Sequence, residues 1–241
     1  TPTWTMLPGD GSKTVYVQFR DLAGNSSGVL SDTIIVDMLP PTGTIVVAGG
    51  VDLTTNSLAR LTLSASDLGS GVASMRFSND NAIWGDWTAY TTSYLWPLSA
   101  GDGAKTVYVQ YRDQGGALSV GTISDSITLD ATGPSIAWAC STTAVDAGYA
   151  VCPADWTTAS SVWVRATLSD TVTGIASVTD TQSPAGADLV TASSSCRSLT
   201  AGAASCTLVW RRTTDTTTGG VTYAVSLADR SGNPASEIGR A

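Results

Sequence analysis

The chain contains no histidine, and it is poor in lysine, glutamate and charge of either sign. The absence of histidine excludes Ser-His-Asp and Cys-His catalysis, His-ligated zinc and most switching near neutral pH. Charged residues make up 13% of the 241 positions, about half the usual share. The net charge of −8 argues against nucleic-acid binding, which needs a basic stripe. No run of 18 apolar residues occurs, so we expect no membrane span.

The acidic residues are almost all aspartate, because Glu237 is the only glutamate among 20. Lys13 and Lys105 are the only lysines. Helix surfaces use Glu and Lys freely, whereas Asp is typical of turns and caps. This bias predicts that the acidic side chains lie in turns between strands. Hydrophobic residues make up 42% of the chain, which is enough to build packed cores.

Four cysteines lie in the last hundred or so residues, at Cys140, Cys152, Cys196 and Cys206. Spacings of 12 and 10 residues favour two local disulfides, although the pairing is not fixed by sequence and unpaired buried thiols are an alternative. The spacings lack C-x-x-C knuckles, which argues against zinc. Disulfides would place the chain outside a reducing cytosol.

A sequence repeat is the strongest feature of the chain. The stretch from Trp4 reads WTMLPGDGSKTVYVQFRDLAGNSS, and the stretch from Trp96, 92 residues later, reads WPLSAGDGAKTVYVQYRDQGGALS without a gap. After one inserted residue the match resumes, with SDTIIVD from Ser31 and SDSITLD from Ser124. Each copy is followed by a proline-containing link. A match of this length indicates tandem copies of one structural unit.

A third copy has diverged further. The segment RATLSDTVTGIASV from Arg165 resembles LTLSASDLGSGVASM from Leu61, and VTYAVSLADRSGN from Val221 resembles KTVYVQFRDLAGN from Lys13. We therefore expect half a repeat, one whole repeat and most of another. The sequence is expected to be a mature product or a window cut from a longer polypeptide.

The repeats read as short strands separated by turns. In KTVYVQFRD, Val15, Val17 and Phe19 alternate with the side chains of the opposite face, which is the period of a half-buried strand. Turn signals such as GDG, DLAGN and DRSGN separate these runs, and no stretch has helical periodicity. About 92 residues per unit with this pattern predict antiparallel β-sandwiches.

The order of these motifs resembles the tandem Ig-like or fibronectin-III-like repeats of large bacterial surface and secreted proteins. The motifs are D-x-x-S-G-V at Asp67, W-x-x-W at Trp84, GDG-x-K-T-V-Y-V-Q-x-R-D, and I-x-x-D before a proline link. The resemblance implies an all-β fold of tandem Ig-like antiparallel β-sandwich domains. Residues 1–42 would be the C-terminal half of an Ig-like repeat and 43–133 a complete one. Residues 134–241 would be a diverged, disulfide-containing repeat that lacks its last strand.

Aspartates at the ends of strands raise the question of a calcium site. Asp37 and Asp130 precede the links, and further aspartates are at the heads of turns, at Asp21, Asp67, Asp113, Asp170 and Asp229. Calcium needs six to eight converging oxygens, and no D-x-D-x-D cluster occurs. Aspartate also accepts backbone N–H bonds in Asx-turns. We therefore assign no metal ligand and no cofactor, and keep calcium as an alternative.

The middle repeat contains an aromatic group, formed by Trp84, Trp87, Tyr90, Tyr94 and Trp96. Such rings pack over a sandwich edge and core, or, if exposed on one plane, stack on sugars. Packing is the preferred interpretation, and a glycan is kept as a further candidate partner.

Catalytic residues are not assigned. Asp10 and Asp102 lie in GDG turns that recur with the repeat, and a catalytic site repeated once per domain would be unusual. We expect no enzyme but an extracellular structural protein of a bacterial surface, a repeat module of a filament, stalk, sheath or adhesin. Its expected partners are copies of itself or adjacent Ig-like repeats. The alternative is a glycan-binding or calcium-rigidified adhesive region of a secreted multidomain protein.

Overall fold

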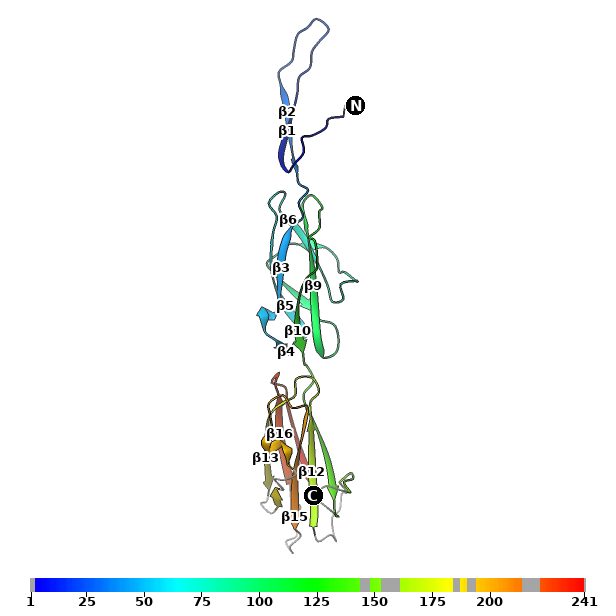
Figure 1. Ribbon diagram of the computed structural model, residues 1–241, viewed down its shortest axis with the longest axis vertical. Helices are drawn as coiled ribbons and strands as arrows, with labels where there is room; N and C mark the ends of the chain where they lie inside the picture. Colours follow the sequence, from blue (N-terminus) through cyan, green and yellow to red (C-terminus); the bar gives the residue numbers. More distant parts are fainter. Residues whose placement is uncertain are drawn as a thin grey trace. The chain divides into compact units, whose positions relative to one another are not determined.

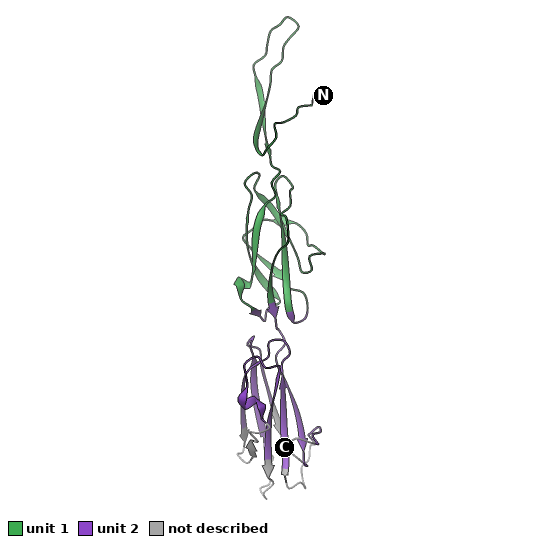
Figure 2. Cartoon of the chain, viewed as in Figure 1, with its two compact units in different colours: residues 1–52, 57–100, 104–127 green, residues 53–56, 101–103, 128–241 purple. Residues whose placement is uncertain are grey.

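The computed structural model describes residues 3–143, 148–152, 161–183, 187–189, 194–213 and 222–240. These residues form two compact units, which Figure 2 colours separately. Unit 1 comprises residues 1–52, 57–100 and 104–127, and unit 2 comprises residues 53–56, 101–103 and 128–241. The described elements are strands apart from two short 3-10 turns, η1 (Ala48–Gly50) and η3 (Ser195–Ser198). The predicted all-β, sandwich-type fold class is therefore confirmed. Within the described residues, no helix is long and apolar enough to cross a membrane.

Unit 1 contains a two-stranded hairpin and a pair of sheets (Figure 1). Its strands are β1 (Gly11–Val17), β2 (Leu30–Val36), β3 (Thr42–Val47), β5 (Leu58–Ser66), β6 (Val72–Ser78), β7 (Thr88–Ala89), β8 (Ser93–Pro97), β9 (Gly103–Asp113) and β10 (Ile123–Leu129). The hairpin pairs β1 with β2, one sheet has the order β3-β5-β8, and the other contains β10-β9-β6-β7. The last residues of β10, which are counted with unit 2, pair in parallel with β4 (Leu53–Thr54).

The core of unit 1 lies between the last two of these sheets. Alternate residues of β5, including Leu61 and Leu63, are buried, as the period-two pattern predicts. From the other sheet β9 contributes Val107, Val109 and Tyr111, which are also buried. The Tyr111 hydroxyl donates a hydrogen bond of 2.7 Å to the backbone oxygen of Thr44. The two sheets are thus joined by a polar contact as well as by apolar burial.

The hairpin β1–β2 has the sequence of β9–β10 but not its burial. Val17 and Phe19 are 44% and 61% exposed, whereas their counterparts Val109 and Tyr111 are 3% and 0% exposed. In the middle repeat the sheet β3-β5-β8 covers this face and β6 pairs with β9, and the hairpin has no such strands within the described chain. The same amphipathic hairpin therefore occurs once covered and once uncovered.

Unit 2 contains two sheets of its own. Beside β4, its strands are β11 (Ser135–Ser141), β12 (Ser161–Ser169), β13 (Ile175–Ser183), β14 (Ala187–Leu189), β15 (Ser205–Thr213), β16 (Thr222–Asp229) and β17 (Pro234–Arg240). The sheets have the orders β11-β12-β15-β14 and β13-β16-β17. Trp210 is fully buried between them and contacts Tyr223, with ring centroids 5.1 Å apart.

Two local disulfides fasten the first of these sheets. Cys140 on β11 is bonded to Cys152, and Cys196 in η3 is bonded to Cys206 on β15. No described cysteine is free. These are the local pairs that the spacing favours, and Cys140, Cys196 and Cys206 belong to the buried core of unit 2.

The end of the chain differs from the expectation that the last repeat lacks its final strand. β17 pairs with β16 along its length, from Ala228↔Pro234 to Thr222↔Arg240. The reason is a tight reversal, in which the backbone N–H of Asp229 donates to the oxygen of Asn233 at 3.2 Å. Pairing thus begins immediately after the turn, whereas several residues separate the equivalent turn from β10. The predicted boundaries after residues 42 and 133 stay predictions.

The two sandwiches share a bulge at the same repeat position. The register shifts between Val72 and Ser74 on β6 and between Ile175 and Ser177 on β13. A glycine with positive φ precedes each bulge, at 83° in Gly71 and 75° in Gly174. This agreement supports the alignment of the diverged third copy with the second.

Candidate metal centres

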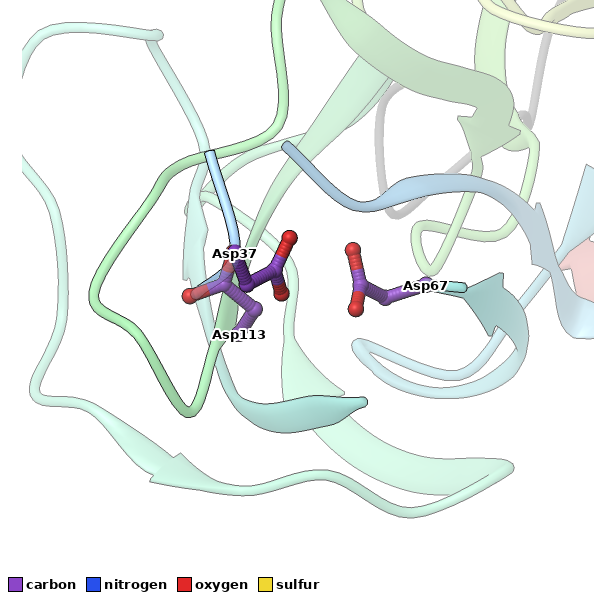
Figure 3. Close-up of side chains that lie close together, drawn as sticks. All are labelled: Asp37, Asp67 and Asp113. Carbon is purple, nitrogen blue, oxygen red and sulfur yellow. The ribbon is translucent and has the colours of Figure 1, made fainter. Parts of the chain in front are cut away.

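Each unit contains a group of three aspartates whose carboxylates converge. In unit 1 the group is Asp37, Asp67 and Asp113, and in unit 2 it is Asp130, Asp170 and Asp229. Within each group, one carboxylate oxygen from every residue lies within 4.8 Å of the other two. Figure 3 shows the unit 1 group, in which the Asp67 carboxylate faces those of Asp37 and Asp113.

The repeat topology brings three separated positions to one end of the sandwich. Asp37 follows β2 and precedes β3, Asp67 follows β5, and Asp113 is the last residue of β9. Because antiparallel strands alternate in direction, the turn after β5 and the turn after β9 can lie at the same end as the start of β3. The unit 2 aspartates follow β10, follow β12 and end β16, respectively.

Turn formation uses one oxygen of each turn aspartate in unit 1. Asp67 Oδ1 accepts hydrogen bonds from the backbone N–H groups of Gly69 and Gly71, at 3.0 and 2.8 Å. Asp113 Oδ1 accepts one from the N–H of Ala117 at 2.8 Å. The second oxygens, Asp67 Oδ2 and Asp113 Oδ2, are buried and have no hydrogen-bond partner. The predicted Asx-turns are therefore present, and they account for only half of each carboxylate.

Asp37 is held by the turn that it faces. Its Oδ2 accepts a 2.6 Å hydrogen bond from the backbone N–H of Ser70, and its Oδ1 accepts a 3.2 Å bond from that of Leu39. Hydrogen bonding by the side chain and backbone of Ser70 holds the pKa of Asp37 below its ordinary value. A Cβ on Gly69 would lie 2.3 Å from the carboxylate carbon of Asp37, so only glycine permits this approach.

The turn aspartates of unit 2 are also held by their own turns, although Asp229 uses both of its oxygens. Asp170 Oδ1 accepts hydrogen bonds from the backbone N–H groups of Val172, Thr173 and Gly174, the shortest being 2.7 Å. Asp229 accepts two from Asn233, from the backbone N–H at 2.9 Å and the side-chain amide at 2.9 Å. Both aspartates are buried.

Asp130 is the most enclosed carboxylate of the six, with 0% of its surface exposed. Its Oδ2 accepts hydrogen bonds from the hydroxyls of Thr173 at 2.5 Å and Ser231 at 3.3 Å. Its backbone oxygen accepts a 2.8 Å bond from the Asn233 side chain. The remaining oxygen, Oδ1, is buried without a hydrogen-bond partner.

No basic side chain neutralises either group within the described residues. The ion pair present there joins Arg197 to Asp180 at 2.6 Å, away from both groups. Three carboxylates at such close range repel one another, and a buried unpaired ion costs several kcal/mol. A cation is the chemical species that would remove both penalties.

The two groups suit a hard cation. Calcium binds oxygen at 2.3–2.6 Å, so two oxygens on one ion are separated by at most about 5 Å, which accommodates the 4.8 Å limit of each group. The three donors are carboxylates, with no nitrogen or sulfur among them, and such donors favour calcium, magnesium or manganese over zinc and copper.

The sequence raised calcium for Asp37 and Asp130 together with the aspartates at the heads of turns, but no metal ligand was assigned, because no local cluster showed which of them converge. The missing signal was the recurrence of three aspartates per repeat, one ending the I-x-x-D strand and one in each of two turns. Local spacing does not reveal this convergence, since about 30 to 60 residues separate successive members in each group.

The GDG aspartates have a different role, since each hydrogen-bonds the backbone of a link. Asp10 Oδ1 accepts a 2.9 Å hydrogen bond from the N–H of Met38. Asp102 accepts bonds from the N–H groups of Ala131 and Thr132, at 2.9 and 3.2 Å. Both contacts fall directly after the first aspartate of a converging group. The GDG motif thus fixes the start of the link in both copies.

The aromatic group of the middle repeat is packed rather than presented as an open plane. The guanidinium groups of Arg76 and Arg112 lie 4.6 and 4.3 Å from the centroid of the Trp87 ring, and Arg76 also contacts Trp84. Trp96 packs on Phe77 and donates a 2.9 Å hydrogen bond to Asn79. Trp84 and Trp87 are half-buried, which supports the packing interpretation.

Comparison with known proteins leaves the family open. No family model matches the chain, and no curated protein matches it. Among solved structures, one match is a tetra-tandem repeat in the extending region of a large adhesion protein, with 22% identity and a TM-score of 0.30. Another is a glycosyl hydrolase family 2 member from Bacteroides cellulosilyticus DSM 14838, with 12% identity and a TM-score of 0.24. The matches cover 96% and 83% of this chain, which spans 56% and 28% of the respective solved chains.

Proposed function

We propose that the chain is an extracellular structural segment of tandem Ig-like repeats, a module of a bacterial surface filament, stalk, sheath or adhesin. Its role is mechanical and involves no catalysis. Each sandwich buries its own core, and neighbouring repeats or other copies of the chain supply the contacts that extend the array. The two disulfides support an oxidising, extracellular location.

The observation that carries this proposal is the uncovered hairpin β1–β2. Its sequence matches β9–β10, whose apolar face is buried under the first strands of the same repeat. An amphipathic hairpin with this pattern is stabilised by a matching half repeat. The hairpin is therefore a contact surface for a chain segment like residues 43–92, either in line with it or from another copy.

The experiment adds that segment. Because Thr1 occupies the repeat position of Ser93, a copy of residues 43–92 fused before Thr1 should complete a sandwich. We expect a third cooperative unfolding transition and slow hydrogen exchange across β1 and β2. Trp4, now 73% exposed, should show blue-shifted emission as it gains the contacts that Trp96 makes with Phe77 and Asn79.

The matched control is the same fusion with aspartate at the added copies of Leu61 and Leu63, which should leave the hairpin exchanging fast. If the unaltered fusion also leaves β1–β2 unprotected, the proposed repeat contact is wrong. Electron microscopy then tests the assembly. Concentration-dependent end-to-end association of the original chain, lost in the completed fusion, is the expected result, and equal behaviour of both would contradict it.

A glycan-binding role is the alternative, but the contacts do not favour it. The Trp87 ring already contacts the guanidinium groups of Arg76 and Arg112, and the Trp84 ring contacts that of Arg76, so part of each ring surface is occupied. We expect no glycan affinity that depends on Trp84 or Trp87.

A further inference from the structure

We propose that each unit binds one Ca²⁺ ion at its group of three aspartates, and that the unit 2 site binds more tightly. The ion in unit 1 is held by Asp37, Asp67 and Asp113, and the ion in unit 2 by Asp130, Asp170 and Asp229. This inference does not depend on the proposed function, because it rests on the carboxylates alone.

The decisive observation is the set of buried oxygens that turn formation does not use. Asp113 is 2% exposed and Asp130 is 0% exposed, yet Asp113 Oδ2 and Asp130 Oδ1 have no hydrogen-bond partner. A buried carboxylate oxygen without a partner is strongly unfavourable. Asp67 Oδ2 repeats the pattern from the opposite side of the unit 1 group. Unused oxygens are thus found in both groups, where a cation would bind them.

The turns alone leave these groups unbalanced. Backbone N–H groups reach Oδ1 of Asp67, Asp113 and Asp170, but they carry no net charge that would offset three carboxylates at close range. A divalent ion offsets two of the three charges and binds an oxygen from each residue. Water and nearby backbone oxygens can complete its coordination.

Calcium fits the geometry better than magnesium. Magnesium binds oxygen at 2.0–2.1 Å in a strict octahedron, so its ligand oxygens are at most about 4.2 Å apart, and it retains several waters. Three converging carboxylates within 4.8 Å of one another are more typical of a calcium site, since magnesium is usually bound through one or two carboxylates.

The two sites differ in how firmly the first aspartate is positioned. In unit 2, Thr173 and Ser231 hold one oxygen of Asp130, Asn233 holds its backbone oxygen, and all three carboxylates are buried. In unit 1, both oxygens of Asp37 already accept backbone N–H bonds, and Asp37 and Asp67 are only half-buried. The residue of unit 1 that corresponds to Asn233 is Ala117, which has no side-chain donor. A preorganised and less exposed site binds calcium more tightly.

Binding would tie the link to the sandwich that follows it. Asp37 and Asp130 are the last residues before the links, whereas their partners lie in turns of the same unit. The ion therefore fixes the segment that leads into β3 or β11. Slow hydrogen exchange of the backbone amides of residues 37–39 and 130–133 should depend on calcium.

The test is calcium titration of the whole chain, stripped with chelator, by isothermal calorimetry. We expect two sites per chain, with the tighter one lost in Asp130→Asn and the weaker one lost in Asp67→Asn, each loss being at least about tenfold in affinity. Magnesium should bind each site at least about tenfold more weakly. The matched control is Asp21→Asn. Asp21 holds the same turn position as Asp113 and makes the same type of bond, to the N–H of Asn25 at 2.8 Å, but belongs to no converging group in the described chain.

Several outcomes would overturn the proposal. If the unaltered, folded chain binds no calcium, the proposed sites are rejected, and no variant is needed for that conclusion. Equal loss in Asp21→Asn shows that turn damage, not ligand removal, is responsible. Equal affinities for magnesium and calcium reject the assigned ion. If Asp130→Asn removes the weaker site, the ranking of the two sites is wrong. Hydrogen exchange of β12 and β16 identifies any variant whose unit 2 has unfolded.

Discussion

The sandwich formed by β3 and β5–β10 in unit 1 can be compared position by position with the sandwich of unit 2. Both have an aspartate-headed turn after the second long strand, a glycine with positive φ, and a bulge two residues later. Both have a second such turn before the last strand, and in both a carboxylate directly before the link converges with those of the two turns. The turns and the link are the common features of the repeat.

The cores differ at equivalent positions. Tyr111 near the end of β9 corresponds to Leu227 on β16, while Val107 corresponds to Tyr223, so the aromatic ring is at opposite ends of the strand. Unit 1 lacks cysteine, and unit 2 has two disulfides beside Trp210. Apolar cores tolerate such exchanges if volume and pattern are kept. We expect the turns to tolerate such exchanges less, because the positions of the three converging carboxylates depend on turn geometry.

The largest expected difference between the sandwiches comes from the disulfides. Replacing Cys196 and Cys206 by alanine should lower the free energy of unfolding of unit 2 by roughly 2–4 kcal/mol, because the unfolded chain regains the entropy of a closed loop. Unit 1 has no cysteine and should be unaffected. Urea unfolding followed by hydrogen exchange in each unit measures both. An equal loss of protection in unit 1 would show that the units do not unfold independently.

A smaller difference should separate two equivalent glycines. A Cβ at Gly174 would lie 2.3 Å from the backbone oxygen of Gly202, whereas a Cβ at Gly71 would meet nothing closer than the Gln114 side chain at 3.8 Å. Gly71→Ala should cost on the order of 1–2 kcal/mol, the penalty for a left-handed backbone conformation. Gly174→Ala adds a backbone clash and should cost clearly more.

Denaturant midpoints of the two alanine variants, assigned to units by hydrogen exchange, make this comparison direct. Gly202→Ala is not a suitable control, because Gly202 also has a positive φ of 92°. Equal costs at Gly71 and Gly174 would mean that the turn containing Gly202 moves away without penalty, and the close approach would then have no role in stability.

Features that depend on neighbouring residues could be predicted from the sequence. The alternation in KTVYVQYRD gives the buried face of β9, and the Asp and Gly residues give the turns, because these preferences are decided within a few residues. The local disulfides follow from short spacings for the same reason. The hairpin β1–β2 was expected as half a repeat, and its exposed Phe19 agrees with that.

Features that depend on distant pairing could not be predicted. The three carboxylates of each group come from separate turns, and only the antiparallel arrangement brings them together. The contact of Trp87 with both Arg76 and Arg112 requires the pairing of β6 with β9. The final strand β17 depends on a reversal directly after Asp229, where the middle repeat has a longer connection.

The smallest expected effect concerns the acid stability of unit 1. It tests Asp37, the aspartate that directly precedes the link to β3. Ser70 holds the pKa of Asp37 below its ordinary value in the folded chain. A lowered folded-state pKa stabilises the fold above the unfolded value, near pH 4, and this contribution is lost as the pH falls through the folded pKa. In chelator, Asp37→Asn should therefore flatten the decline in the stability of unit 1 between about pH 4 and the lower folded pKa.

Ser70→Ala should flatten that decline in part, since it removes the side-chain contribution and leaves the backbone N–H of residue 70 in place. Urea midpoints across this range provide the measurement, and unit 2 of the same molecules is the internal reference. If Asp37→Asn leaves the acid dependence of unit 1 unchanged, the hydrogen bonds from Ser70 do not couple protonation to folding. The link before β3 would then depend on the bound cation, and on Asp10, for its attachment.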